Sequence, residues 1–379
     1  MLPLPTTSLR TAFEQLADPR RPGRTLTFPL TEIITIALCA VIGGANSWVA
    51  VETFGHAKQA WFKRFLNLEH GIPSHDTFGR VFALLNPLAF QNCFREWITG
   101  VCERLGIRHV AIDGKRLAGS EDAGLGVQAI HLVSAWASEV RLTLGQVAVE
   151  EKSNEITAIP KLLEMLEIAG ALVTIDAMGC QKEIAAKIRE RQADYVLAVK
   201  ENQPHLHEDL ERLFREALEQ ETLDAHWDYH QSEAKNHGRD EVRLCWVLHD
   251  VDGVRDRDLW QDLCSVIVVV TERGIGDSSH SEVRYYISSR NGSAAEFAKA
   301  IRRHWGIENE CHWVLDVVFG EDGSRVRKDQ EAENVGWLRR MVLSLLKQVK
   351  GKRSVAATRL AAGWNEEFLE QILLNLLGN

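Results

Sequence analysis

The sequence of 379 residues has no apolar run long enough to cross a membrane. Its most apolar stretch, residues 33–45, is shorter than the roughly 20 residues that a spanning helix needs, and Glu32 precedes it, so it predicts a buried helix. The stretch also begins too far from residue 1 for a secretory signal peptide. Low-complexity segments are absent. With 45% hydrophobic and 26% charged residues, we expect a folded protein without a membrane partner, built as two or three domains or as one large domain with an insertion.

The cysteines lack the paired spacing of metal-binding motifs and are scattered through apolar segments. They stand at positions 39, 93, 102, 180, 245, 264 and 311. This distribution is typical of reduced core residues and argues against a zinc site. We therefore expect a cytoplasmic protein.

The chain also lacks an excess of positive charge. Its net charge of -9 argues against a surface that coats nucleic acid nonspecifically, because neutralising phosphates requires Lys and Arg. A local basic track is still open to the chain, since residues 321–359 contain ten Lys or Arg and five Asp or Glu. Further arginines lie near the start, at positions 10, 20, 21 and 24. Solvated helix faces explain these clusters equally well.

Residues 1–105 predict an all-helical N-terminal domain, because apolar residues recur at spacings of three and four. The expected helices cover residues 8–17, 30–43, 47–65, 74–85 and 87–105. Ser74 is typical of a helix N-cap, where its hydroxyl accepts from a free backbone amide. This domain could bind DNA, dimerise or brace the rest of the chain, and the sequence does not choose among these roles.

Residues 106–203 and 292–350 predict an α/β catalytic core. Apolar runs of strand length cover residues 109–113, 129–137, 141–150, 171–177 and 195–200. Helical patterns cover residues 154–169 and 181–192. The order βββαβαβ, with helices on a mixed sheet, is that of a ribonuclease H-like core.

Residues 204–291 depart from that core and predict a β-rich insertion. A charged helix at 205–220 is followed by strand patterns at 227–233, 240–248, 264–271 and 283–290. The helical pattern returns at Ala294 and runs through Glu308, and a second helix covers residues 330–350. Residues 351–379 predict a short helical appendix.

Three acids on separate elements suggest a metal site. Asp113 and Asp176 each follow an apolar strand run, and Glu308 shares a helix face with His312 and Asp316 at spacings of four. Two close, buried carboxylates repel each other unless a cation compensates them. Their hard oxygen ligands suit Mg²⁺ or Mn²⁺. Taken singly, each Asp is explained equally well as a turn or cap residue.

Other residues near these acids are candidates for holding DNA. Lys115 and Arg116 follow Asp113, and side chains at positions 200, 202 and 203 follow a core strand, where Lys200, Asn202 and Gln203 can contact phosphates or base edges. Further candidates are His237, Arg239 and Arg243, which alternate along one predicted strand, and Arg303, His304, Trp305 and His312. Solvated strand ends are the alternative for the polar residues. Trp305 and Trp313 could stack on an unpaired base, but core packing is the more common role of tryptophans at helical spacing.

Several long motifs occur in a fixed order: VAIDGKRLAGS at 110–120, KSNEITAIP at 152–160, TIDAMGCQK at 174–182, DYVLAVKENQ at 194–203, HGR at 237–239 and HWGIEN at 304–309. Together they resemble the DDE transposases of bacterial insertion sequences, in the ISAs-type or H-repeat-associated branch. DPR at 18–20 and GIPSHDTFGRV at 71–81 resemble the N-terminal DDE-associated domain of that branch. The resemblance covers nearly the whole chain.

The resemblance implies that Asp113, Asp176 and Glu308 form the catalytic, metal-binding triad, with Mg²⁺ as cofactor and Mn²⁺ as a substitute. It also implies double-stranded DNA partners, namely the terminal inverted repeats of the element and the target DNA, a homodimer in the DNA complex, and association with the nucleoid.

The chain departs from the relatives' pattern around Glu308. Where related transposases carry a Tyr, an Arg and a Lys, this sequence has Ile301, His304 and Leu315. His304 or Arg303 is a candidate replacement for the Arg, and His312 or Asp316 for a branch-specific role.

The resulting hypothesis is a DNA transposase that cleaves the ends of an insertion sequence and transfers them into target DNA. Two alternatives remain open from the sequence: a structure-selective nuclease with the same fold, and a domesticated or inactive DNA-binding relic.

Overall fold

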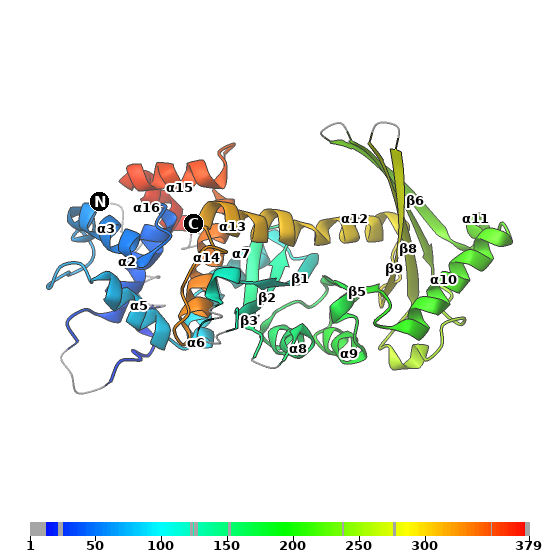
Figure 1. Cartoon of the computed structure of the whole chain (residues 1–379), viewed down its shortest axis with the longest axis horizontal. Coiled ribbons are helices and arrows are strands. Elements are labelled where there is room, and N and C mark those ends of the chain that lie inside the picture. Colours follow the sequence, from blue (N-terminus) through cyan, green and yellow to red (C-terminus); the bar gives the residue numbers. More distant parts are fainter. Residues whose placement is uncertain are drawn as a thin grey trace.

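The computed structural model of the chain describes residues 13–21, 26–121, 124, 128–150, 153–236, 239–275, 278–349 and 351–375. Figure 1 shows helices gathered at one end of an elongated molecule, a sheet with helices on both faces in the middle, and a blade of long strands at the other end. None of the helices in the described ranges has the length and hydropathy needed to span a bilayer.

The N-terminal region is helical, as predicted, but its helices are shorter than expected. They are α2 (Leu30–Ile42), α3 (Trp48–Ala57), α4 (Gln59–Phe62), α5 (His75–Leu84), α6 (Pro87–Asn92) and α7 (Arg95–Leu105). The helix predicted at 47–65 is split into α3 and α4, and the one at 87–105 into α6 and α7. The helix predicted at 8–17 lies mostly outside the described residues.

Ser74 occupies the predicted N-cap position of α5, but its side chain does not cap the helix. Its hydroxyl lies instead 3.2 Å from the Thr77 hydroxyl. Ser47 and Asn86 do cap their helices, accepting from the backbone amides of Ala50 and Ala89 at 3.2 and 2.9 Å.

The first half of the sheet has the predicted order of strands and helices. Its elements are β1 (His109–Arg116), β2 (His131–Ala137), β3 (Leu142–Ala148), α8 (Glu155–Met165), β4 (Leu172–Ile175), α9 (Lys182–Glu190) and β5 (Asp194–Val199), with 3₁₀ turns η1 (Ala118–Ser120) and η2 (Ala177–Gly179). β1, β2 and β3 pair antiparallel, whereas β4 pairs parallel with both β1 and β5. The predicted mixed α/β sheet is therefore confirmed.

Alternate residues of β1 enter two different cores. Val110 and Ile112 pack with apolar residues of α8 and α9 on one face. Ala111 packs on the other face, in the core that includes the N-terminal helices. The continuous apolar run of β1 follows from this burial on both faces.

The segment 204–291 extends the core sheet. It contains α10 (Pro204–Glu219), α11 (Leu223–His226), β6 (Asp228–Asn236), β7 (Arg239–Leu248), η3 (Arg257–Leu259), β8 (Ser265–Ile275) and β9 (Ser278–Ser288). β9 pairs antiparallel with β5, so the full strand order is β3-β2-β1-β4-β5-β9-β8-β7-β6. Leu210 and Phe214 of α10 cover one face of this extension, and Phe297 and Ile301 of the helix α12 cover the other.

The helix predicted to run from Ala294 through Glu308 is interrupted. α12 (Ala294–His304) begins with a capping box between Ser293 and Glu296 and is followed by a π-helical turn, η4 (Ile307–His312), and by α13 (Trp313–Phe319). The extra residue in a π turn breaks regular helical spacing, and such turns are frequent at functional sites. The expectation of one regular helix was therefore wrong.

The last helices tie the C-terminal region to the N-terminal one. α14 (Glu331–Gln348), α15 (Val355–Trp364) and α16 (Glu366–Asn375) lie beside α2 and α3 in Figure 1. Trp61 donates to Glu370 at 2.7 Å, and Arg359 donates to the Val41 carbonyl at 2.9 Å. Three arginines of the predicted basic track, Arg339, Arg340 and Arg359, are buried. The track is therefore not a continuous surface, because these guanidiniums bond inside the protein.

Candidate functional site

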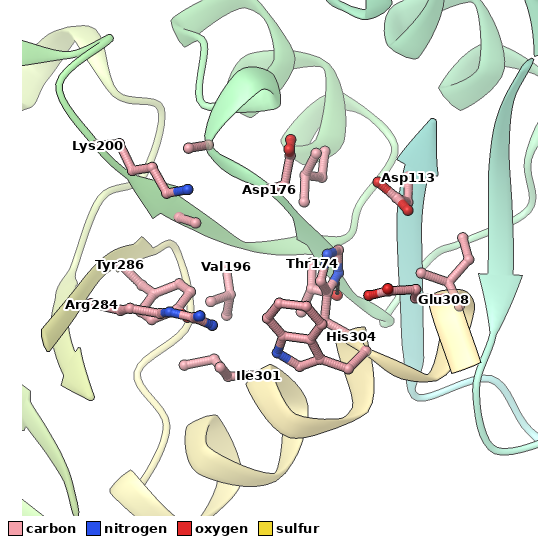
Figure 2. Close-up of a pocket in the computed structure, with 15 residues that line it drawn as sticks. Asp113, Thr174, Asp176, Val196, Lys200, Arg284, Tyr286, Ile301, His304 and Glu308 are labelled. Atoms are coloured by element: carbon pink, nitrogen blue, oxygen red, sulfur yellow. Dashed lines mark hydrogen bonds between the residues drawn. The ribbon is translucent and has the colours of Figure 1, made fainter. Parts of the chain in front are cut away.

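Parallel pairing of β1 and β4 brings Asp113 and Asp176 to the same level of the sheet. Ile112 of β1 is in register with Ile175 of β4, and each is followed in the chain by an Asp, Asp113 within β1 and Asp176 directly after β4. Glu308 comes from the π turn after α12. All three acids line one cavity of about 240 Å³. Figure 2 shows their carboxylates around the same side of this cavity, hereafter the acid cavity.

Asp176 caps a turn, and its surroundings disfavour the ionised form of its carboxyl. Its Oδ1 accepts from the backbone amides of Met178 and Gly179 at 3.0 and 3.4 Å, so it caps the η2 turn. Burial raises the pKa of the Asp176 carboxyl, and the charges of Glu155 and Asp113 raise it further. The cap interpretation of Asp176 is correct, and a cation near this carboxylate would stabilise its ionised form.

Asp113 has a different environment. Burial opposes its ionisation, but the hydrogen bond and charge of His312 outweigh it, with a contribution from His304, and hold the pKa of Asp113 below its usual value. The His312 Nδ1 lies 3.4 Å from Asp113 Oδ2. Gly114, the next residue, leaves room for the Glu155–His131 pair, because a Cβ there would come within 2.1 Å of Glu155 Oε1.

The donor set of the acid cavity fits a divalent cation in its chemistry. Three carboxylates supply hard oxygen atoms, and burial raises the pKa of Asp176, a shift that a bound cation would oppose. Within the described residues, no three acidic, His or Cys side chains already converge on one point. The residues therefore match the ligand type of Mg²⁺ or Mn²⁺, while the spacing of this structure is more open than a complete coordination shell.

A chain of buried hydrogen bonds ends at His304. His109 Nε2 lies 2.9 Å from the Thr174 hydroxyl, which lies 3.0 Å from His304 Nδ1. At the other end, His109 Nδ1 lies 3.0 Å from the Ser138 hydroxyl, which donates to the Arg303 carbonyl at 3.5 Å. Burial lowers the pKa of His109 to about 3, with the charges of His304 and Arg303 adding to the effect, so this ring is neutral at pH 7.

These contacts fix the proton positions along the chain. Because the Ser138 hydroxyl donates to a carbonyl, it accepts from His109 Nδ1–H, and His109 Nε2 then accepts from the Thr174 hydroxyl. Thr174 in turn accepts from His304 Nδ1–H. The neutral His304 ring therefore has its lone pair on Nε2, and this ring lines the acid cavity. Burial lowers the pKa of His304, although Asp113 and Asp176 pull it upward.

Other predicted DNA contacts have different places in the structure. Lys200 is exposed and lines the acid cavity opposite the acids (Figure 2). Arg243 lines a neighbouring cavity, and Trp305 lines both cavities. Trp313 is 58% exposed, so the core interpretation of this residue was wrong. His237 and the Arg239 side chain lie outside the described part of the chain.

Several predicted contacts are engaged within the protein. Lys115 is buried and forms ion pairs with Asp316 and with Asp322, the latter at 3.0 Å. Asn202 donates to the Ala177 carbonyl at 2.7 Å and Gln203 to the Cys180 carbonyl at 2.9 Å, so both brace the turn after Asp176. These contacts give Lys115, Asn202 and Gln203 structural roles, and their contacts with DNA stay a prediction.

Two other predicted arginines form ion pairs, Arg116 with Glu121 and Arg303 with Glu139. Glu308, His312 and Asp316, which were predicted to share one helix face, all lie toward β1: Glu308 lines the cavity with Asp113, His312 approaches Asp113, and Asp316 contacts Lys115.

Sequence reasoning missed Arg284 and Tyr286, which line the acid cavity from β9. Their alternation along one strand was visible, but their position depends on the pairing of β9 with β5, which places Tyr286 opposite Ala198. It also missed His109 and Thr174, whose hydrogen bonds join strands that are 65 residues apart in the chain.

Two protein families match the chain. Residues 104–345 match the model of the family described as Transposase DDE domain. The chain belongs to the DDE transposase family. Residues 10–98 of this transposase match the DDE_Tnp_1-associated family, as the N-terminal motifs predicted. The family implies the ribonuclease H-like fold, so the predicted fold class is confirmed.

Relatives extend over most of the chain. The "Putative transposase YncI" of Escherichia coli O157:H7 is 40% identical over 363 residues, which cover 94% of this chain and 92% of the relative. The "H repeat-associated putative transposase YhhI" of Escherichia coli K12 is 41% identical over 322 residues, 84% of each chain. The predicted branch and the activity class, DNA transposase, are thereby confirmed. Members of this family generally depend on divalent metal ions.

Proposed function

We propose that this transposase cleaves the ends of an insertion sequence and joins them to target DNA with Asp113, Asp176 and Glu308 as its catalytic acids. The observation that carries the proposal is the lining of one cavity by these three carboxylates, which come from β1, the end of β4 and the π turn. Side chains from such distant segments share a cavity only in the folded chain.

Asp113, Asp176 and Glu308 would hold Mg²⁺ or Mn²⁺. When bound, the ion supplies Lewis acidity and lowers the pKa of a water or a 3′ hydroxyl. The residues of the chain position the DNA. Figure 2 shows Lys200 and Arg284 across the cavity from the acids, where their cationic groups can hold the scissile phosphate. His304 Nε2 can accept a proton from the attacking hydroxyl, because Nδ1 is committed to Thr174.

The wider assembly is part of the same proposal. We expect the duplex ends of the element and the target duplex as DNA partners, a homodimer in the DNA complex, and action at the nucleoid in the cytoplasm. Free thiols at all seven cysteines agree with that compartment. Light scattering of the purified protein with and without element-end DNA measures whether the dimer forms.

The proposal is tested with purified protein, Mg²⁺ and a labelled duplex made from the DNA that flanks the gene. We expect nicked and joined products on a denaturing gel, and their loss in Asp113→Asn. Nicking without joining to any target would favour the structure-selective nuclease. Cleavage that persists in Asp113→Asn would overturn the assignment of the acids.

A further inference from the structure

A second cavity of about 160 Å³ adjoins the acid cavity. It lies between α12 and the strands β7, β8 and β9. The two cavities share Arg284, Tyr286, Ile301 and Trp305 as lining residues. Figure 2 shows three of these, Arg284, Tyr286 and Ile301, on the side of the acid cavity away from the carboxylates. A strand of DNA that enters the acid cavity therefore has a continuation on this side.

Four arginines line the second cavity, hereafter the arginine cavity: Arg243 from β7, Arg273 from β8, Arg284 from β9 and Arg302 from α12. Glu241 forms ion pairs with Arg243 and with Arg273, the latter at 2.9 Å, and Glu282 with Arg284 at 2.8 Å. Among the described residues, the Arg302 side chain forms no hydrogen bond or ion pair, although its positive charge helps to lower the pKa of Glu241. The cations here outnumber the carboxylates that they contact, in a chain whose net charge is -9.

The arginines also crowd one another. Burial lowers the pKa of Arg243, and the positive charges of Arg302, Arg273 and Arg284 lower it further. An anion placed among these guanidiniums would remove this repulsion. Arginine suits a phosphate best, because its planar fork donates two parallel hydrogen bonds to phosphate oxygens.

Trp305 joins the two cavities. Its ring lines both and is 38% exposed, and the Arg284 guanidinium carbon lies 5.1 Å from the ring centroid. This cation–π contact holds Arg284 at the boundary. The side of α12 that faces the acids carries no positive charge, because Ile301 is apolar and buried and the neutral His304 ring is hydrogen-bonded to Thr174.

We infer that the arginine cavity binds a backbone phosphate of the DNA strand, next to the phosphate that the acid cavity receives. The inference rests on the proposed function and adds to it the path of the strand: from the acids, past Arg284 and Trp305, into the extension of the sheet. In this chain the strands β7, β8 and β9, together with Arg302, supply phosphate contacts on that path.

The salt dependence of DNA binding tests the inference. Each phosphate contact contributes about 0.9 to the slope of log affinity against log salt concentration. We expect Arg302→Ala to bind the labelled flanking duplex about tenfold more weakly and with a slope smaller by about 0.9. Arg302 is exposed and has no described partner, so its loss should leave the thermal unfolding midpoint unchanged. Arg104→Ala, an exposed arginine at the end of α7, is the matched control and should bind like the wild type.

The phosphate that the arginine cavity contacts can be located by making one backbone phosphate at a time uncharged. Replacing backbone phosphates one at a time by methylphosphonates should weaken wild-type binding at a position beside the scissile bond. The same replacement should have little further effect on Arg302→Ala, because the two changes remove one contact. Suppose that the wild type cleaves the duplex and that Arg302→Ala and Arg284→Gln both bind it with the wild-type affinity and salt slope. This result would overturn the inference and leave the proposed function standing. A wild-type protein that neither binds nor cleaves the duplex would overturn the proposed function as well.

Discussion

The two cavities on either side of Arg284 and Trp305 carry charges of opposite sign. In the acid cavity, carboxylates from β1, β4 and the π turn face inward, and burial raises the pKa of Asp176. In the arginine cavity, guanidiniums from three strands and α12 lie together, and burial lowers the pKa of Arg243. In each cavity burial disfavours the charged form of a lining side chain. A ligand of opposite charge would stabilise that form, a cation in one cavity and a phosphate in the other.

This difference in charge predicts that substitutions in the two cavities affect different properties, catalysis in one cavity and DNA affinity in the other. Substitutions of the three acids should remove catalysis and retain DNA binding, whereas substitutions of the arginines in the arginine cavity should weaken DNA binding. Four further predictions test this division, beginning with the largest effect.

Glu308→Gln should reduce cleavage by more than roughly 100-fold, since even residues behind a metal's ligands affect activity by 10–100-fold. Affinity for the flanking duplex should stay within about twofold of the wild type, because no described phosphate contact is lost. Glu310→Gln is the matched control: Glu310 is on the same π turn but forms an ion pair with Arg141 at 2.9 Å. Equal losses in both variants would show that the turn, and not the Glu308 carboxylate, is what matters.

Lys115→Met removes a buried cation close to Asp113. The ion pairs of this lysine within the protein indicate that it stabilises the fold. Burial opposes its charge, but Glu321, Asp316 and Asp322 outweigh this and raise the pKa of Lys115. Removing the cation leaves these carboxylates without their partner, so we expect a loss of about 2 kcal/mol in the free energy of unfolding. Chemical denaturation measures the loss. The salt slope of DNA binding should not change. A slope smaller by about 0.9, the contribution of one phosphate contact, would show that Lys115 contacts DNA.

Thr174→Val tests the hydrogen-bond chain behind His304. Valine keeps the shape but removes both hydrogen bonds, one to His109 and one to His304. We expect cleavage to fall about tenfold, the equivalent of roughly one buried hydrogen bond, with DNA affinity retained. The nitrogen NMR shifts of His304 should change from those of an Nδ1–H ring to those of a tautomer mixture.

A purely packing role of Thr174 would leave the His304 tautomer unchanged. Thr358→Val is the matched control, because Thr358 is also buried but its hydroxyl donates only to the Ser354 carbonyl, at 2.9 Å.

The pH dependence of stability should report the buried neutral ring of His109. Its pKa is about 3 in the fold and about 6.5 unfolded, so the unfolded chain binds more protons between these values. Stability is therefore full above about pH 6.5 and falls as the pH drops toward 3, by up to roughly 1.4 kcal/mol per pH unit. Thermal unfolding of wild type and His109→Phe over this range should show a smaller pH slope in the variant, and equal slopes would contradict the assignment.

Local pattern was enough to predict the strands that carry Asp113 and Asp176. Their continuous apolar runs reflect burial on both faces, and an Asp directly after each run is visible without any long-range contact. Glu308 was selected by resemblance to a family, because Glu310 stands two residues away on the same pattern. The π turn between α12 and α13 was not predictable, since helical spacing in the sequence does not reveal one extra residue in a turn.

The bonds that several predicted DNA contacts form within the protein could not be read from the sequence. Lys115, Asn202 and Gln203 were predicted as DNA contacts, and the structure adds bonds within the protein, from Lys115 to Asp316 and from the two amides to backbone carbonyls of the turn after Asp176. Whether a polar side chain is free or engaged depends on neighbours that a sequence pattern does not identify.

The sequence by itself determined the mixed α/β core, the helical N-terminal region and the two acids that follow apolar strand runs, because periodicity and burial are local properties of the chain. Only the tertiary structure decided that β9 joins β5, and this pairing carries Arg284 to the border of the acid cavity. The same pairing aligns β7, β8 and β9 beneath α12 and collects four arginines from separate elements. The physical reason is that hydrogen bonds between distant strands set their order and register, and these bonds leave no local pattern in the sequence.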